Sequence, residues 1–168
     1  MDLLDSNHWS DVHRLLGELD RDIAALYADA GIEGVRTRFV GPLIALGRSG
    51  PQTIRELAGR RGVSHSAMSQ TVTAMRQAGL VESAPGTDGR TRLVQLTDRA
   101  HEILPFMEAE WRATEATTRA LDAELPYSLT QVVADLRAAL GRRSFADRLQ
   151  DNFDLGTTAD GSRGRGAV

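Results

Sequence analysis

The sequence contains no cysteine, and this absence removes several classes of function. Without a thiol the chain forms no disulfide, no thiolate metal site and no cysteine nucleophile, and it has no thiol redox sensor. It also contains no apolar run near the roughly 20 residues that a membrane span requires. The N-terminal stretch MDLLDSNHWSDVHRLL is acidic and polar, unlike a secretory or transit peptide. These absences predict a cytoplasmic protein without membrane contact.

The sequence also lacks the motifs of common enzymes and metal sites. His8 and His13 are five residues apart and therefore do not share a helix face, and the other two histidines are distant. Glu108 and Glu110 are two apart on a predicted helix, so their carboxylates do not form a catalytic pair. No phosphate-binding loop, nucleophile elbow or dinucleotide-binding fingerprint after a strand is present. We therefore predict no metal, no cofactor and no enzymatic activity.

Lysine is absent as well, so all 20 basic side chains are arginine. The net charge is −3, but the charge is unevenly distributed. The segment from Arg48 to Arg99 holds eight arginines and four acidic residues, a net of +4, so the rest of the chain carries −7. A basic middle between acidic ends favours a nucleic-acid partner. Chance variation in composition is the alternative interpretation.

Apolar spacing divides the chain into helices and one strand pair. On several stretches apolar residues recur at steps of three and four, the period of an amphipathic helix. Two strand-sized runs, LVESA and RLVQL, flank the turn sequence PGTDGRT and predict a β-hairpin. The tail TTADGSRGRGAV has no apolar pattern, and we expect it to be disordered. The expected helices span Asn7–Ala30, Val35–Leu46 with a bend at Gly41-Pro42, Thr53–Gly62, Ser64–Ala78, Thr97–Leu121 with a kink at Pro105, and a last one from Pro126 that continues to Leu149.

Two short helices follow one another in the basic segment. Thr53 and Glu56 have the spacing of a capping box, which opens the first helix. Gly62 ends this helix, and Ser64 is placed to cap the second. Two capped helices joined by the tight turn RRGVS make a helix-turn-helix, and a β-hairpin directly after them makes the winged form. We therefore predict an α+β chain, mostly α, with a winged helix-turn-helix lobe between long flanking helices.

The outer face of the second short helix is suited to the major groove of DNA. Met68, Val72 and Met75 lie at helical spacing and are expected to face inward. No acidic residue occurs from Val63 to Leu80, whereas a solvated helix face usually carries one. Short polar side chains with one arginine can read base edges, and a helix N-terminus attracts phosphate. An ordinary solvated face is the alternative. The predicted DNA contacts on this helix are Ser64, His65, Ser66, Ser69, Gln70, Thr73 and Arg76.

The turn of the predicted hairpin is rich in arginine. Asp88-Gly89 is a signal for a tight turn. Arg90, at its tip, is predicted to enter the minor groove, where narrow A·T-rich stretches concentrate negative potential. Arg92 lies two residues on, points to the same face and is predicted to bind backbone phosphate. A salt bridge from Asp88 would fix the direction of Arg90. The alternative is a surface turn whose charges serve only solubility.

These segments resemble a known protein family. TIRELAGRRGVSHSAMSQTVTAMRQAGLVES, then DGRTR, then VQLTDRA are similar to the multiple-antibiotic-resistance-regulator (MarR) family of winged-helix transcription factors. The similarity runs in register over about Val35–Ala100, while the outer helices match in pattern. The Asp-x-Arg wing, followed by Leu-Thr at the start of the next helix, points to this family among winged helices.

The resemblance implies a homodimer and a small-molecule effector. In this family the N- and C-terminal helices interdigitate as a dimerisation region, and the long apolar stripes of the first and last helices here agree with that. Two-fold symmetry implies a pseudo-palindromic operator with half-sites about one helical turn apart. Members commonly bind small anionic aromatic compounds between the dimerisation region and the winged helix, which releases DNA. The candidate effector residues are Trp9, His13, Leu16, Arg38, Phe39, Leu43 and Trp111, with core packing as the alternative for the apolar ones.

Our interpretation of the sequence is a homodimeric, ligand-responsive DNA-binding regulator. We expect a repressor, rather than an activator, of genes for the response to drugs or phenolic compounds. One alternative is a winged-helix module that binds protein and not DNA, which the polar and basic helix face disfavours. Another is a different winged-helix family, such as the phenolic-acid-regulator type, which the long N-terminal helix disfavours. The expected divisions are 1–34 for the N-terminal dimerisation helix, 35–100 for the DNA-binding lobe, 101–150 for the C-terminal dimerisation helices and 151–168 for the tail.

Overall fold

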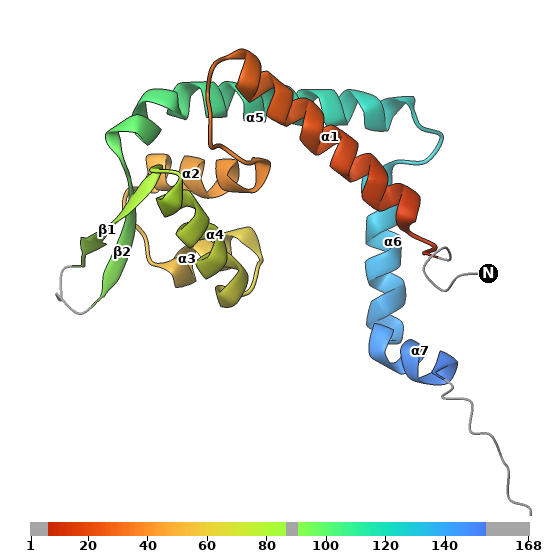
Figure 1. Ribbon diagram of the computed structural model, residues 1–168. Helices are drawn as coiled ribbons and strands as arrows, with labels where there is room; N and C mark the ends of the chain where they lie inside the picture. The colour runs from red at the N-terminus through yellow and green to blue at the C-terminus, as the bar shows by residue number, and fades with distance from the viewer. Residues whose placement is uncertain (1–6, 87–90, 154–168) are drawn as a thin grey trace, which may run out of the picture. The chain divides into compact units, whose positions relative to one another are not determined.

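The computed structural model describes residues 7–86 and 91–153, and it is mostly helical with one small sheet (Figure 1). This composition confirms the predicted α+β, mostly α, class. The chain divides into two compact units, one up to Glu115 and one from Ala116 onwards. Within the described residues, no helix is both long and apolar enough to cross a bilayer. The elements in chain order are α1 (Ser10–Asp29), α2 (Thr37–Ser49), α3 (Ile54–Arg61), α4 (His65–Gln77), β1 (Val81–Pro85), β2 (Arg92–Leu96), α5 (Asp98–Glu124), α6 (Leu129–Arg142) and α7 (Phe145–Asn152).

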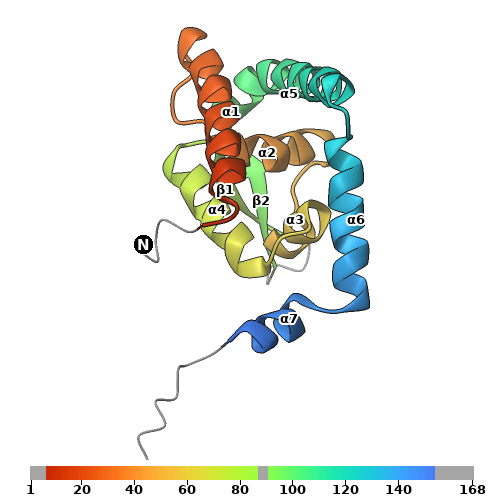
Figure 2. The same cartoon turned by 90° about the vertical axis from the view of Figure 1, so that its right-hand side faces the viewer.

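Helix α2 is the centre of the core of the first unit. It contacts α1, α3, α4 and β2, and Figures 1 and 2 show it between α5 and the α3–α4 pair. Burial from several sides explains why this helix is the most apolar of the described helices. It runs unbroken through Pro42, three residues beyond its expected end at Leu46. Its buried apolar residues are Phe39, Val40, Pro42, Leu43, Ile44 and Leu46.

The expectation of a single last helix that continues to Leu149 is wrong. Helix α6 ends at Arg142, and a separate helix α7 begins at Phe145. The break occurs because Ser144 and Asp147 form a capping box: Ser144 Oγ accepts from the Asp147 N–H at 3.1 Å, and Asp147 Oδ2 accepts from the Ser144 N–H at 3.3 Å. The local cap therefore starts a new helix after Arg143 and ends the continuation expected from the apolar spacing of α6.

Helix α6 begins at Leu129, after the position expected from Pro126. The Asp122 carboxylate of α5 accepts from Leu129 N–H at 2.6 Å and from the Ser128 hydroxyl at 2.7 Å. These hydrogen bonds, with that of Ser128 the largest cause, lower the pKa of the Asp122 carboxyl. Ser128 also caps α6, so one carboxylate and one hydroxyl together fix the turn between α5 and α6.

A buried polar contact joins α1 to α5. The Tyr27 hydroxyl donates to Glu110 Oε2 at 3.1 Å, and the Thr114 hydroxyl donates to Glu110 Oε1 at 2.7 Å. The Tyr27 ring also packs edge-on against Phe106, with 5.1 Å between ring centroids. Burial, together with the adjacent Glu110 carboxylate, raises the pKa of the Tyr27 hydroxyl above its ordinary value. Tyr27 therefore stays a hydrogen-bond donor and fixes the end of α1 on α5.

We expect Tyr27→Phe to lower the free energy of unfolding by about 1–3 kcal/mol, because it leaves a buried carboxylate oxygen without its donor. Urea denaturation followed by circular dichroism measures this change. Tyr127→Phe is the matched control, since Tyr127 is 78% exposed and its hydroxyl is free to bond to water. An equal effect of the two substitutions would contradict the role given to the Tyr27 contact.

Candidate nucleic-acid interface

The first helix of the helix-turn-helix is opened by the capping box expected from the sequence. Thr53 Oγ1 accepts from the Glu56 N–H at 3.2 Å, and Glu56 Oε2 accepts from the Thr53 N–H at 2.8 Å. The hydrogen bonds from Thr53 lower the pKa of the Glu56 carboxyl. The backbone N–H groups of Thr53 and Glu56 have no partner within the helix, and the two side chains supply one for each. These bonds fix the start of α3.

The turn between α3 and α4 is set by a glycine and a serine. Gly62 adopts a left-handed conformation with φ of 64°, which other residues rarely adopt. The Val63 N–H then donates to the Ala58 carbonyl at 3.1 Å and closes the end of α3. Ser64 Oγ accepts from the Ala67 N–H at 3.2 Å and caps α4. The exposed N-terminus of α4 is thus placed immediately after a tight turn.

Helix α4 has an apolar inner face and a polar outer face. Met68, Val72 and Met75 are buried against the core, as predicted. The outer face carries hydroxyl, amide, imidazole and guanidinium groups and no carboxylate. Its polar side chains therefore form a continuous surface that can approach an anionic partner without charge repulsion. On this face Ser64, His65, Ser66, Gln70, Thr73 and Arg76 are exposed, and Ser69 is half-buried.

Internal hydrogen bonds orient two of these side chains. The Thr73 hydroxyl donates to the Ser69 carbonyl at 2.9 Å, which leaves the oxygen lone pairs of Thr73 as acceptors. Arg76 Nη2 donates to Ser83 Oγ at 3.1 Å, so the guanidinium lies at the junction of α4 and β1. A cation held beside the hairpin is suited to a backbone phosphate at the edge of a groove.

The hairpin is antiparallel, with a register that runs from Val81 paired with Leu96 to Pro85 paired with Arg92. The two strands are those expected from LVESA and RLVQL. Arg92 is the first residue of β2 and is exposed. The predicted tip residue Arg90 and its proposed partner Asp88 lie outside the described residues.

Gln52 is a supporting residue that the sequence reasoning missed. Its N–H donates to the Val94 carbonyl at 3.0 Å, and the Val94 N–H donates to the Gln52 carbonyl at 2.7 Å. The side-chain Nε2 donates to the Ala45 carbonyl of α2 at 3.1 Å, and the residue is 5% exposed. Gln52 thereby ties the hairpin to α2. Its position in a loop sequence gave no signal of this, because its partners are distant along the chain.

Comparison with known proteins finds a family match over the helix-turn-helix and the first strand of the hairpin. A model of the MarR family matches residues 43–91, which run from the middle of α2 to the residue before β2. The matched segment belongs to the MarR family. This match confirms the family recognised from the sequence, whose members are transcription regulators and not enzymes.

Several solved structures share the fold of this chain. The chain is similar to the M. tuberculosis transcriptional regulator MosR in complex with DNA, with a TM-score of 0.57 and 22% identity over 82% of this chain and 99% of that chain. It is also similar to the Streptomyces coelicolor regulator PcaV in complex with its natural ligand, with a TM-score of 0.55 and 18% identity over 86% and 98%. A third similar fold is overoxidized AbfR bound to DNA, with a TM-score of 0.53 and 16% identity over 79% and 88%. No curated protein matches the chain significantly.

The seven effector candidates predicted from the sequence occupy different environments. Phe39 and Leu43 are 1% and 0% exposed and belong to the core, which favours the packing alternative for both. Trp111 is half-buried, and the Arg61 guanidinium lies over its ring at 5.4 Å from the centroid. The remaining candidates, Trp9, His13, Leu16 and Arg38, are exposed.

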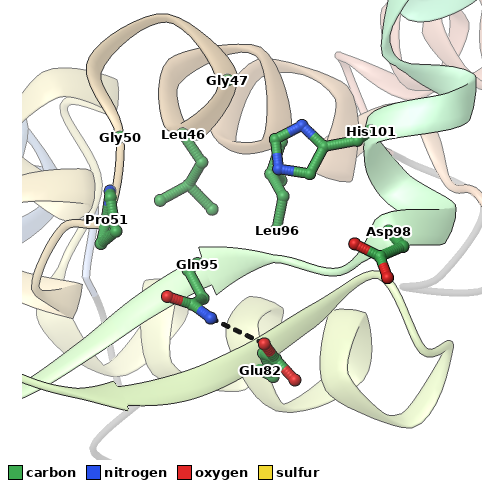
Figure 3. A pocket seen from close by; sticks show the side chains of 9 residues that line it. All are labelled: Leu46, Gly47, Gly50, Pro51, Glu82, Gln95, Leu96, Asp98 and His101. Carbon is green, nitrogen blue, oxygen red and sulfur yellow. Dashed lines mark hydrogen bonds between the residues drawn. The ribbon is translucent and has the colours of Figure 1, made fainter.

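A hollow of about 320 Å³ lies where the end of α2, the hairpin and the start of α5 meet (Figure 3). Glu82 accepts from Gln95 Nε2 at 2.6 Å on its wall, and Asp98 and His101 face it from α5. Two carboxylates disfavour an anionic ligand here, and none of the seven effector candidates lines this hollow. In the part of the chain that the structure describes, no three histidine or carboxylate side chains are grouped to hold a metal ion.

Proposed function

We propose that this MarR-family protein is a homodimeric repressor that binds a pseudo-palindromic operator and is released by a small aromatic or anionic effector. The observation that carries the proposal is the outer face of α4. This face is polar, basic and free of carboxylates, its capped N-terminus is open to solvent, and an arginine-bearing hairpin adjoins it. A major groove about 12 Å wide admits such a helix.

The chemistry of each side chain determines its proposed role. The side chains of Ser66, Ser69, Gln70 and Thr73 are short donors and acceptors at the centre of the face, and we assign them to base edges. His65 lies beside them at the first position of α4. Ser64, Arg76 and Arg92 are assigned to phosphates, because they lie at the helix N-terminus and beside or on the hairpin. Arg90 is assigned to the minor groove from the sequence alone.

The similar folds support a nucleic-acid partner. MosR and AbfR are both described bound to DNA, and each shares the arrangement of this chain over most of its length. At 22% and 16% identity these likenesses concern the fold, so the DNA partner of this chain rests on its own α4 surface.

Exposed apolar surface supports the homodimer. Around the start of α1, Trp9, Val12, Leu15 and Leu16 are all exposed, and α6 presents a second apolar stripe. A soluble chain rarely leaves such stripes in water, and burial against a second copy removes them from it. The exposed apolar residues of α6 are Leu129, Val132, Val133, Leu136 and Leu140.

For the effector we infer a site close to Trp111. The Arg61 guanidinium over the Trp111 ring offers both a cation and an aromatic face, which suits a small aromatic carboxylate. Arg38 and His13 are the further candidate donors. The similarity to PcaV, described in complex with its natural ligand, is consistent with a small-molecule effector.

Electrophoretic mobility shift with the DNA that flanks the gene of this protein tests the proposal. We expect a retarded complex that weakens steeply with salt and is released by simple phenolic acids. Absence of salt-sensitive binding to any duplex by folded protein would overturn the DNA-binding role. Binding that no phenolic acid relieves would overturn only the effector part.

Gln70→Ala and Arg92→Ala are expected to weaken operator binding in different ways. Loss of the Gln70 amide should cost about 1–3 kcal/mol of binding free energy and relax the preference at one base position in each half-site, because a base edge loses its partner.

Arg92→Ala should weaken binding to all duplexes alike and reduce the slope of log affinity against log salt by about 1 per subunit. Titrations of a base-substitution series at several salt concentrations measure both. An unaltered sequence preference in Gln70→Ala would remove this residue from base reading.

A further inference from the structure

The end of α4 is held by residues at the start of α5. The three residues that follow α4 are Ala78, Gly79 and Leu80, and the backbone carbonyl of each accepts a hydrogen bond. Arg99 Nη1 donates to the Ala78 carbonyl at 2.6 Å, Thr97 Oγ1 to the Gly79 carbonyl at 2.8 Å, and the Thr97 N–H to the Leu80 carbonyl at 3.2 Å. The carbonyls at a helix C-terminus have no partner within the helix, so these donors satisfy groups that would otherwise be free.

Arg99 also reaches a third part of the fold. Its other terminal nitrogen, Nη2, donates to the Glu33 carbonyl at 2.6 Å in the loop between α1 and α2. One guanidinium therefore links the end of α4, the start of α5 and the loop that follows α1. Both bonds are short and charge-assisted, which makes them stronger than bonds between neutral groups.

Both carbonyls that accept from the Arg99 guanidinium are followed by a glycine in a left-handed conformation. Gly79 follows the Ala78 carbonyl and Gly34 follows the Glu33 carbonyl, and their φ values of 68° and 77° are in the range that favours glycine. A Cβ added at Gly79 would lie 3.9 Å from Arg99 Nη1, and one added at Gly34 would lie 3.9 Å from Arg99 Nη2. The turn at Gly79 and the turn at Gly34 therefore each present a carbonyl to one terminal nitrogen of Arg99.

We propose that Arg99 is a positioning residue for DNA recognition, one that fixes the angle of α4 by fastening its C-terminal end to the α1–α2 loop. This inference rests on the proposed DNA-binding function. The role assigned to Arg99 is structural, because each of its terminal nitrogens holds a backbone carbonyl of a different part of the fold. A planar fork is needed to hold two separate carbonyls, and the single nitrogen of a lysine side chain cannot reproduce that geometry.

The test uses the full-length protein and a duplex enriched by it from a random 30-base-pair library, with a shuffled duplex of equal composition as the non-specific probe. We expect Arg99→Lys and Arg99→Met each to weaken binding to the enriched duplex about tenfold. Binding of Arg99→Lys to the shuffled duplex should stay as in the wild type, because its charge is kept. Arg21→Met, which removes an exposed arginine of α1, is the charge control for Arg99→Met and should keep the wild-type ratio of specific to non-specific affinity.

A double-mutant cycle separates positioning from general loss of stability. If Arg99 sets the angle of α4, Gln70→Ala should cost clearly less in the Arg99→Lys protein than in the wild type, since Gln70 is already displaced from its base. Thermal melting of each variant accompanies the titrations, and Arg99→Lys decides the outcome if Arg99→Met does not fold. Wild-type affinity and full additivity in Arg99→Lys would overturn the inference and leave the proposed function intact. If the wild type enriches no sequence from the library, the proposed sequence-specific function fails, and this inference fails with it.

Discussion

Leu136→Asp, on the exposed apolar face of α6, is expected to separate the proposed homodimer into monomers and to abolish tight operator binding. Leu136 is 39% exposed in the single chain and lies at the centre of the α6 stripe. A carboxylate buried without a partner costs about 3–5 kcal/mol, and two-fold symmetry places one such group in each subunit. The dimer dissociation constant should therefore rise by more than about a thousandfold. Analytical ultracentrifugation measures the change in mass, and titration with the operator measures the loss of affinity.

Ala138→Asp is the matched control for this prediction. Ala138 is exposed on the same helix, and at 100° per residue it lies about 180° around α6 from the stripe. Ala138→Asp adds the same charge to the same helix but outside the apolar stripe. It should therefore leave the mass of the dimer and its DNA affinity unchanged. If Leu136→Asp remains a dimer with wild-type affinity, the α6 stripe does not form the subunit interface.

The part of the fold that the sequence predicted well is the part set by local signals. The Thr53–Glu56 capping box, the Ser64 cap and the left-handed Gly62 each act within four residues, and each is found in the structure. The division of the last helix was missed even though Ser144 and Asp147 carry a local signal of the same kind. The regular apolar spacing from Leu129 to Leu140 favoured one long helix, and the cap signal that follows it was not weighed against that spacing.

The candidate site was predictable only in part, for a related reason. Helical periodicity is enough to separate the inner and outer faces of α4, so the outward side chains follow directly from the sequence. The supports of that helix depend on contacts that are distant along the chain. Gln52 pairs with Val94, and Arg99 bonds to Glu33, 66 residues away. Such partners are decided by tertiary packing, which periodicity does not report. Burial of Phe39 in the core is a further case, since an apolar residue near a proposed pocket has the same pattern as one inside the core.

Ser64→Asp is expected to weaken operator binding strongly without lowering the stability of the lobe. Aspartate caps a helix as well as serine does, and its charge interacts favourably with the helix N-terminus. An aspartate oxygen can therefore accept the hydrogen bond that the Ala67 N–H now donates to Ser64 Oγ. At the proposed phosphate contact, however, the same carboxylate repels DNA. Two unit charges about 4 Å apart interact by about 1–4 kcal/mol at the dielectric constants of water and of a protein surface, which corresponds to about a fivefold to a thousandfold loss for each recognition helix.

The separation of these two effects makes the substitution informative. Ser144→Asp adds one carboxylate at the cap of α7, outside the helix-turn-helix, and should change operator affinity little. Thermal melting should give a midpoint for Ser64→Asp that is no lower than that of the wild type, and mobility-shift titration should show much weaker operator binding by Ser64→Asp. Equal affinity would place the N-terminus of α4 away from the DNA backbone, and the orientation proposed for the whole helix in the groove would then be wrong. Reduced affinity together with an intact fold would require that this end of α4 lies against phosphate, which in turn directs the side chains from Ser66 to Thr73 toward the bases.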